Sequence, residues 1–212
     1  MCSIPSDLWC DSAESARQCG VVEQCKKFQR LAKPIRLTLL YETLCPFCQK
    51  FITNDLQSLY DEFQDQIEFE LVPWGNSRIM QGKIVCDHGA KECVANRLQS
   101  CVLDSIPARQ ALPFIICFEK KIAGSNTESV LEQCSSFLTI YYNQIKTCFN
   151  TDRGYQSQIQ AARRTMTVRP NPVSEVPYLT INGYSPNVAT NNLNIHALKY
   201  LLKKWLHRGK LM

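Results

Sequence analysis

The chain has 212 residues, of which 45% are hydrophobic and 20% are charged, and its formal net charge is +5. This composition predicts a globular protein with one full hydrophobic core and excludes a disordered chain. Basic and aromatic side chains form no array, so we expect no nucleic-acid partner, and the longest apolar run, residues 112–118, is too short for a transmembrane segment.

The first 30 residues carry four cysteines and few large apolar side chains. A segment this short cannot form a core alone, so we expect disulfides to hold it together. Its cysteine spacing resembles that of a saposin A-type segment. We expect this module at residues 1–31 and the main domain at residues 32–212. The four cysteines are Cys2, Cys10, Cys19 and Cys25.

Twelve cysteines in a chain of this length indicate an oxidising compartment, which favours the lysosome, the endosome or secretion. The sequence begins without the basic and apolar regions of a signal peptide. We therefore expect a mature chain from which such a peptide has been removed.

Residues 35–41 form an apolar run typical of a buried strand, and a Cys-x-x-Cys motif follows it. After the motif, apolar residues recur at three- and four-residue steps, which predicts an amphipathic helix. Cys45 would then open the helix, where free N–H groups and the helix dipole favour a thiolate. Pro46 suits the first helical position, and Cys48, one turn on, could attack a mixed disulfide at Cys45. The apolar face consists of Cys48, Ile52, Leu56, Leu59 and Phe63.

Two other interpretations of the motif are half of a zinc site and a short structural disulfide. A zinc site needs a second ligand pair of suitable spacing. A structural pair is rarely placed between a buried strand and an amphipathic helix. The local context therefore favours a redox-active dithiol.

Residues 67–72 alternate in polarity and predict a second strand, parallel to the first in a βαβ unit. The stretch from about 78 to 166 has a mainly helical pattern and six cysteines, which predicts a disulfide-stapled helical insertion. A strand is expected again at residues 178–181, where Asn182-Gly183 predicts a hairpin to a strand that starts at Tyr184. A closing helix is expected at residues 193–206.

We expect the six cysteines of the insertion to pair among themselves, as those of the N-terminal segment do, which leaves one reducible pair, Cys45 and Cys48. His88 also allows a zinc site of three thiolates and one imidazole, but in an oxidising compartment we expect disulfides and no metal. His88 is expected to stabilise the turn before Glu92, without a catalytic role. The six cysteines are Cys86, Cys93, Cys101, Cys117, Cys134 and Cys148.

The segment from Cys86 reads Cys-Asp-His-Gly-Ala-Lys-Glu-Cys-Val-Ala-Asn, followed after four residues by another cysteine. It closely resembles the signature of the gamma-interferon-inducible lysosomal thiol reductase family, with Asp87 where that family usually has glutamine. The Cys-x-x-Cys motif and residues 71–76 and 176–178 also resemble this family, and the resemblance covers about residues 33–206. The signature positions are Cys86, His88, Gly89, Glu92, Cys93, Asn96 and Cys101.

This resemblance implies an α/β, thioredoxin-like fold and an enzyme that reduces protein disulfides in acidic endolysosomes. Cys45 would be the catalytic nucleophile, Cys48 would resolve the mixed disulfide, and Pro177 would follow a cis peptide bond beside the dithiol. The implied partners are disulfide-bonded proteins and a small thiol reductant, with no cofactor. The supporting, substrate-binding positions would be Pro46, Phe47, Val176 and Pro177.

Two rival functions fit the same sequence. The fold could serve a secreted disulfide oxidase or isomerase, because the residues between the two cysteines influence the redox potential. Alternatively, a secreted binding protein could act through its N-terminal module and keep a vestigial dithiol. Reduction of a disulfide substrate that depends on Cys45 would exclude the binding protein, and the reduction potential would separate the enzymes.

Overall fold

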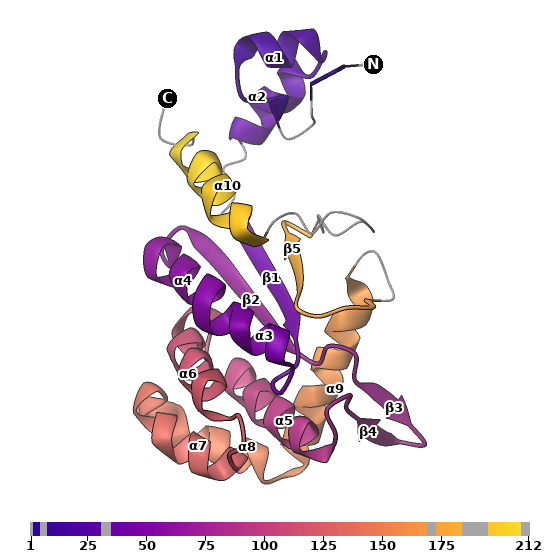
Figure 1. Cartoon of the computed structure of the whole chain (residues 1–212), viewed down its shortest axis with the longest axis vertical. Helices are drawn as coiled ribbons and strands as arrows, with labels where there is room; N and C mark the ends of the chain where they lie inside the picture. Colours follow the sequence, from indigo (N-terminus) through magenta and orange to yellow (C-terminus); the bar gives the residue numbers. More distant parts are fainter. Residues whose placement is uncertain (1, 5–7, 31–34, 169–172, 184–194, 209–212) are drawn as a thin grey trace. The chain divides into compact units, whose positions relative to one another are not determined.

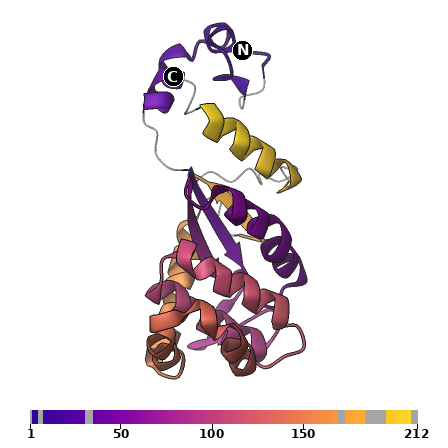
Figure 2. The same ribbon diagram turned by 90° about the vertical axis from the view of Figure 1, so that its left-hand side faces the viewer.

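A computed structural model describes residues 2–4, 8–30, 35–168, 173–183 and 195–208 (Figures 1 and 2). The chain divides into two compact units, residues 35–199 and residues 1–34 together with 200–212. The sequence pattern assigns residues 32–212 to the main domain. Within the ranges described, no helix combines the length and apolar character needed to cross a membrane.

The smaller unit contains two short helices, α1 (Ala13–Gln18) and α2 (Val22–Arg30), and the second half of α10 (Ile195–Arg208). Ser12 caps α1 by accepting a hydrogen bond from the Ser15 N–H at 3.0 Å. Lys204 of α10 forms an ion pair with Asp11. Two disulfides close the segment, Cys2–Cys19 and Cys10–Cys25.

The larger unit is built on a three-stranded sheet in the order β2-β1-β5. Strand β1 (Ile35–Tyr41) pairs in parallel with β2 (Ile67–Pro73), as the βαβ pattern predicts, and antiparallel with β5 (Tyr178–Ile181). Leu39 stands opposite both Leu71 and Leu179 in the centre of the sheet. The strand expected from Tyr184 onward lies outside the described residues.

One face of the sheet carries a continuous helical segment made of α3 (Pro46–Lys50), η2 (Phe51–Leu56) and α4 (Gln57–Phe63) (Figure 1). All five predicted apolar positions of this segment are buried. The middle part, η2, is a π-helix, and Phe51 is buried there as well. Phe51 lies three residues after Cys48, so it belongs to the same apolar face of the helical segment.

Helix α9 (Asp152–Thr167) covers the opposite face, so the sheet lies between two helical layers (Figures 1 and 2). Leu40, Val72 and Tyr178 of the three strands belong to one buried cluster with Ala161 and Ala162 of α9. Small residues on α9 allow this close approach of helix and sheet.

The expected insertion begins with a hairpin of β3 (Arg78–Met80) and β4 (Lys83–Val85), joined by Gln81 and Gly82, both with positive φ. Its helices α5 (Ala90–Ser105) and α6 (Ala108–Lys121) precede a shorter helical series. The helical pattern expected for the insertion is interrupted there, with Thr139 at a φ of 45°. The series comprises α7 (Thr127–Cys134), η3 (Ser135–Phe137), η4 (Thr139–Tyr141) and α8 (Tyr142–Phe149). Three disulfides staple the insertion, Cys86–Cys93, Cys101–Cys148 and Cys117–Cys134.

Candidate active site

The two cysteines outside the five disulfides lie where β1 leads into α3. Cys45 is the N-cap residue of α3, with an extended backbone, and Pro46 occupies the first helical position. The sequence pattern predicts that Cys45 is the more exposed sulfur. The difference is small, because Cys45 is 5% exposed and Cys48 is fully buried.

The chain before β5 reaches the dithiol from the other side. The Val176–Pro177 peptide bond is cis, and the Val176 carbonyl oxygen lies 4.0 Å from Cys45 Sγ. The expected cis bond beside the dithiol is thereby confirmed. Phe47, two residues after Cys45, is 74% exposed. The Val176 carbonyl thus borders the sulfur of Cys45, and an exposed aromatic ring belongs to the same motif.

The two cysteines have very different pKa values because their surroundings differ. The pKa of Cys45 is lowered to about 6, and the largest cause is a hydrogen bond from the Cys48 thiol. The backbone N–H groups of Cys48 and Phe47 and the positive charge of His88 lower this pKa further, whereas burial raises it. The same thiol–thiol hydrogen bond, together with burial, raises the pKa of Cys48 far above its ordinary value. Cys45 is therefore the thiolate and Cys48 the proton-bearing partner.

His88 stands beside the dithiol, in a place that its sequence position did not indicate. Its Nδ1 atom lies 2.6 Å from Glu92 Oε2 and 3.4 Å from Glu42 Oε2, and both carboxylates are buried. One atom each of Glu42, Cys45 and His88 lie within 4.8 Å of one another. Metal sites use these donor types. In this structure His88 Nδ1 is bound to Glu92, and Glu42 Oε1 accepts a hydrogen bond from the Asn76 N–H at 2.5 Å. The three side chains are close enough to influence one another's charge, and we refer to them as the electrostatic cluster.

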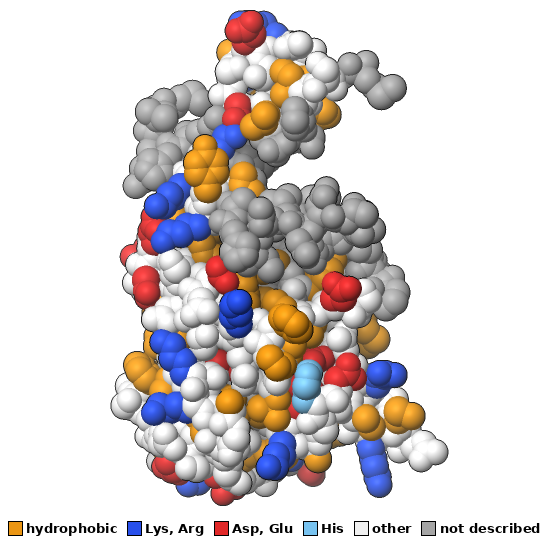
Figure 3. Space-filling view, viewed as in Figure 1, with side chains coloured by type: hydrophobic (Ala, Val, Ile, Leu, Met, Phe, Trp, Pro, Cys, Tyr) orange, Lys and Arg blue, Asp and Glu red, His pale blue; other side chains and the backbone are white. Residues whose placement is uncertain are grey.

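Histidine and acidic side chains adjoin hydrophobic ones on the surface of the larger unit (Figure 3). The side chain of His88 is 38% exposed, whereas that of Glu92 is fully buried. Solvent can thus exchange protons with the imidazole while the buried carboxylate fixes its orientation.

Glu42 is held from three directions. Its backbone N–H donates to Cys48 Sγ at 3.5 Å, its carboxylate accepts the Asn76 N–H, and Gly75 packs against its side chain. Burial raises the pKa of Glu42 to about 7, with further contributions from Glu92, Asp87 and Cys45, while the Asn76 N–H opposes them.

Buried polar side chains, including Asn96 of α5, contact the turn between β1 and Cys45. Asn96 of α5 accepts a hydrogen bond from the Thr43 N–H at 3.0 Å and another from its hydroxyl. The Tyr41 hydroxyl donates to Gln99, whose amide donates to Glu119 at 2.6 Å. Burial raises the pKa of Glu119 well above its usual range. Asn96 thereby fixes the β1–α3 turn on α5.

The signature residues thus divide between two roles. The Cys86–Cys93 disulfide closes the loop that carries His88, and Gly89, with a φ of 83°, begins α5. The His88 N–H donates to Glu92 at 3.2 Å, as expected for a residue that stabilises this turn. Cys101 instead pairs with Cys148 between helices. Sequence reasoning missed the proximity of His88 to Cys45.

Glu42 and Gly75 were not singled out from the sequence either. An acidic residue between a buried strand and a Cys-x-x-Cys motif is a signal that could have identified Glu42. Gly75 belongs to the turn after β2, and only its φ of 56° and the nearby Glu42 side chain show why glycine is needed there.

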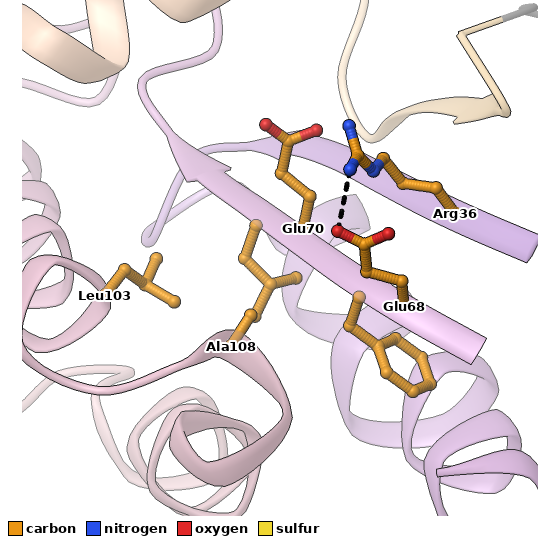
Figure 4. A pocket seen from close by; sticks show the side chains of 7 residues that line it. Arg36, Glu68, Glu70, Leu103 and Ala108 are labelled. Carbon is orange, nitrogen blue, oxygen red and sulfur yellow. Dashed lines mark hydrogen bonds and ion pairs between the residues drawn. The ribbon is translucent and has the colours of Figure 1, made fainter. Parts of the chain in front are cut away.

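A pocket of about 270 Å³ lies along β2, away from the cysteines (Figure 4). Arg36 and Glu68 form an ion pair of 2.8 Å at its rim, and Glu70 binds Arg164 through both carboxylate oxygens. Because these charges are paired and no cysteine lines the pocket, it is not the candidate active site.

Comparison with known proteins places this geometry in a family. A gamma-interferon-inducible lysosomal thiol reductase of Carassius auratus is 35% identical over 188 residues, which cover 86% of this chain and 72% of that protein. The chain belongs to the gamma-interferon-inducible lysosomal thiol reductase (GILT) family. The GILT family profile matches residues 36–138, and a saposin A-type domain profile matches residues 1–29.

Other GILT relatives agree. A gamma-interferon-inducible lysosomal thiol reductase of Mus musculus is 30% identical and covers 70% of this chain. A gamma-interferon-responsive lysosomal thiol protein of Arabidopsis thaliana is 32% identical with the same coverage. The chain spans about three fifths of the length of these two relatives. As a GILT family member, it is a thiol oxidoreductase.

Solved structures confirm the thioredoxin-like fold. Oxidised BdbD from Bacillus subtilis superimposes with a TM-score of 0.57 at 14% identity, over 83% of this chain and 87% of that chain. A putative protein disulfide isomerase from Nitrosomonas europaea gives a TM-score of 0.54 at 15% identity, over 83% and 99% of the two chains. At these identities the likeness concerns the fold alone.

Proposed function

We propose that this chain reduces disulfide bonds of protein substrates in the endolysosomal pathway, at acid pH, with Cys45 as nucleophile and Cys48 as resolving thiol. The observation that carries the proposal is the division of acidity within the dithiol, a stabilised thiolate on Cys45 next to a buried thiol on Cys48. Family membership supports the direction of the reaction.

The reaction takes two exchanges. The Cys45 thiolate attacks one sulfur of the substrate disulfide, and the other substrate sulfur leaves as a thiolate that takes a proton from water. Cys48 then loses its proton and attacks Cys45 Sγ, which releases the second substrate thiolate. The substrate gains two electrons, the enzyme retains a Cys45–Cys48 disulfide, and a small thiol reductant restores the dithiol.

The residues around Cys45 suit an extended peptide substrate. The Val176 carbonyl and Pro177 offer a backbone edge beside the sulfur, and the exposed ring of Phe47 offers an apolar contact next to Pro46. Disulfides in folded proteins seldom reach such a buried sulfur. Unfolded or partly unfolded proteins are therefore the proposed substrates.

Acid pH is compatible with this thiol. A cysteine of ordinary pKa, about 8.5, is only about 0.03% thiolate at pH 5, whereas a pKa of about 6 gives about 10%. We place the enzyme in lysosomes or endosomes, or among secreted proteins. Its proposed domains are the saposin A-type module at 1–31 and the reductase domain at 32–212.

The test is cleavage at pH 5 of a single disulfide in a denatured protein, by the full chain pre-reduced with a small thiol. We expect reduction in the wild type and none in Cys45→Ser. The reduction potential is measured on the same samples. A potential near about −120 mV, which is typical of a strong oxidant, would contradict the proposal and favour a disulfide oxidase.

A further inference from the structure

We propose that His88, held in place by Glu92 and Glu42, supplies a positive charge that increases the fraction of Cys45 present as thiolate in acid solution. The inference rests on the proposed function, because it explains how that function operates at low pH. It assigns His88 a positioning and electrostatic role in the reaction, in addition to its contacts within the turn.

The geometry places the charge where it acts. His88, just before the α5 N-terminus, and Cys45, at the end of the β1–α3 turn, approach within 4.8 Å. The imidazole cannot turn away freely, because Nδ1 is bound to Glu92 and the flanking disulfide, Cys86–Cys93, closes the loop. Of the groups named above that lower the pKa of Cys45, His88 is the one with a positive charge.

At acid pH the cluster carries a positive charge on His88, which favours a thiolate on Cys45. Burial alone would lower the pKa of His88, but Glu92, Glu42 and Cys45 outweigh it and raise that pKa above the usual value. His88 is therefore an imidazolium at pH 5. The pKa of Glu42 is raised to about 7, so at pH 5 this carboxyl is neutral and does not cancel the charge of His88.

The electrostatic stabilisation of the Cys45 thiolate by the cluster decreases as the pH rises past neutrality. Glu42 then ionises next to Cys45, and His88 loses its proton. Other titratable groups face the cluster. Asp87 and Glu92 raise the pKa of Glu42. Glu119 and Tyr41 belong to the buried network with Gln99. Arg78 forms an ion pair with Asp87 at 3.5 Å. None of these supplies a cation directed at Cys45, so His88 adds a charge contribution to the thiolate beyond the hydrogen bonds from Cys48 and Phe47.

The first measurement is the rate of Cys45 alkylation against pH in the reduced full chain, in the wild type, His88→Gln and Lys91→Gln. Lys91 is an exposed cation three residues from His88, so its variant is a matched control for loss of charge. We expect His88→Gln to raise the midpoint by about 0.5–1 unit, which lowers the thiolate fraction at pH 5 about three- to tenfold. Lys91→Gln should leave the midpoint unchanged.

The second measurement uses reciprocity, since two coupled groups shift each other equally. The pKa of the His88 imidazole is followed by NMR in the reduced wild type and in Cys45→Ala. Loss of the thiolate should lower the pKa of His88 by the same amount as His88→Gln raises that of Cys45. A purely structural His88 would not show this shift, and the experiment does not depend on the folding of His88→Gln.

The outcomes separate the two proposals. If the wild type reduces the disulfide substrate but neither midpoint moves, His88 does not act on Cys45 and this inference is overturned. Equal movement of both midpoints establishes it. If the wild type fails to reduce the substrate at all, the proposed function fails, whatever the titrations show.

Discussion

Gly75 lies directly against Glu42, so closely that a Cβ atom on residue 75 would come within 2.3 Å of Glu42 Cγ. The residue also has a φ of 56°, which side chains rarely adopt. The turn after β2 and the carboxylate beside the dithiol therefore share one packed site, and a change in the turn is transmitted to the active site.

Gly75→Ala should lower the free energy of unfolding by about 2–5 kcal/mol, through backbone strain and overpacking together. Gly82→Ala is the matched control, because Gly82 has a φ of 75° but nothing within 4 Å of where a Cβ atom would lie, so strain alone costs about 1–2 kcal/mol. Urea unfolding measures both. Equal losses in the two variants would show that Gly75 does not press on Glu42.

Glu42→Gln should flatten the dependence of stability on pH. Glu42 titrates near 7 in the folded chain and near 4.5 when unperturbed, so between these values the native state keeps a proton that the unfolded state releases. The free energy of unfolding therefore falls as pH rises through this window, by at most about 3 kcal/mol, and is unaffected below it. Urea unfolding at pH 4.5 and pH 8 measures the effect. Glu42→Gln should lose this decrease in the free energy of unfolding, and the exposed control Glu128→Gln should keep it. An unchanged decrease in Glu42→Gln would contradict the prediction.

Cys48→Ser should accumulate a covalent complex with a disulfide-bonded protein substrate, because the Cys45 thiolate still attacks but nothing resolves the mixed disulfide. Cys45→Ser should form no such complex, since the pKa of Cys48 is raised and its sulfur is fully buried. Non-reducing electrophoresis and mass mapping identify the linked cysteine. A complex formed through Cys48 in Cys45→Ser would reverse the two roles.

Mild reductant should open the Cys45–Cys48 disulfide of the oxidised enzyme before any other in the larger unit. Cys86–Cys93 and Cys117–Cys134 should follow, because Cys93 and Cys117 are partly exposed, whereas Cys101 and Cys148 are at most 2% exposed. Differential alkylation with mass mapping gives the order. Early reduction of the buried Cys101–Cys148 bridge would contradict this ranking and point to local opening of the helices.

The sequence predicts the structural elements that are determined by residues close together in the chain. The helix after Cys45 follows from apolar spacing, and the parallel pairing of β1 and β2 follows from two strands joined by that helix. The meeting of His88 with Cys45 depends on how α5 packs against the β1–α3 turn, through the contact of Asn96 with Thr43. Neither residue carries a local signal for that contact. The break at Thr139 carries no local signal either, since β-branched side chains rarely adopt a positive φ.

The disulfide that closes the loop around His88 sets limits on the cellular reductant. A thiol strong enough to recharge Cys45–Cys48 must still be too weak to open Cys86–Cys93, because an opened loop would free the imidazole from its place beside the nucleophile. The enzyme therefore has a bounded operating range of redox potential. Too oxidising a medium leaves the Cys45–Cys48 pair as a disulfide, and too reducing a medium releases the imidazole that helps to stabilise the Cys45 thiolate.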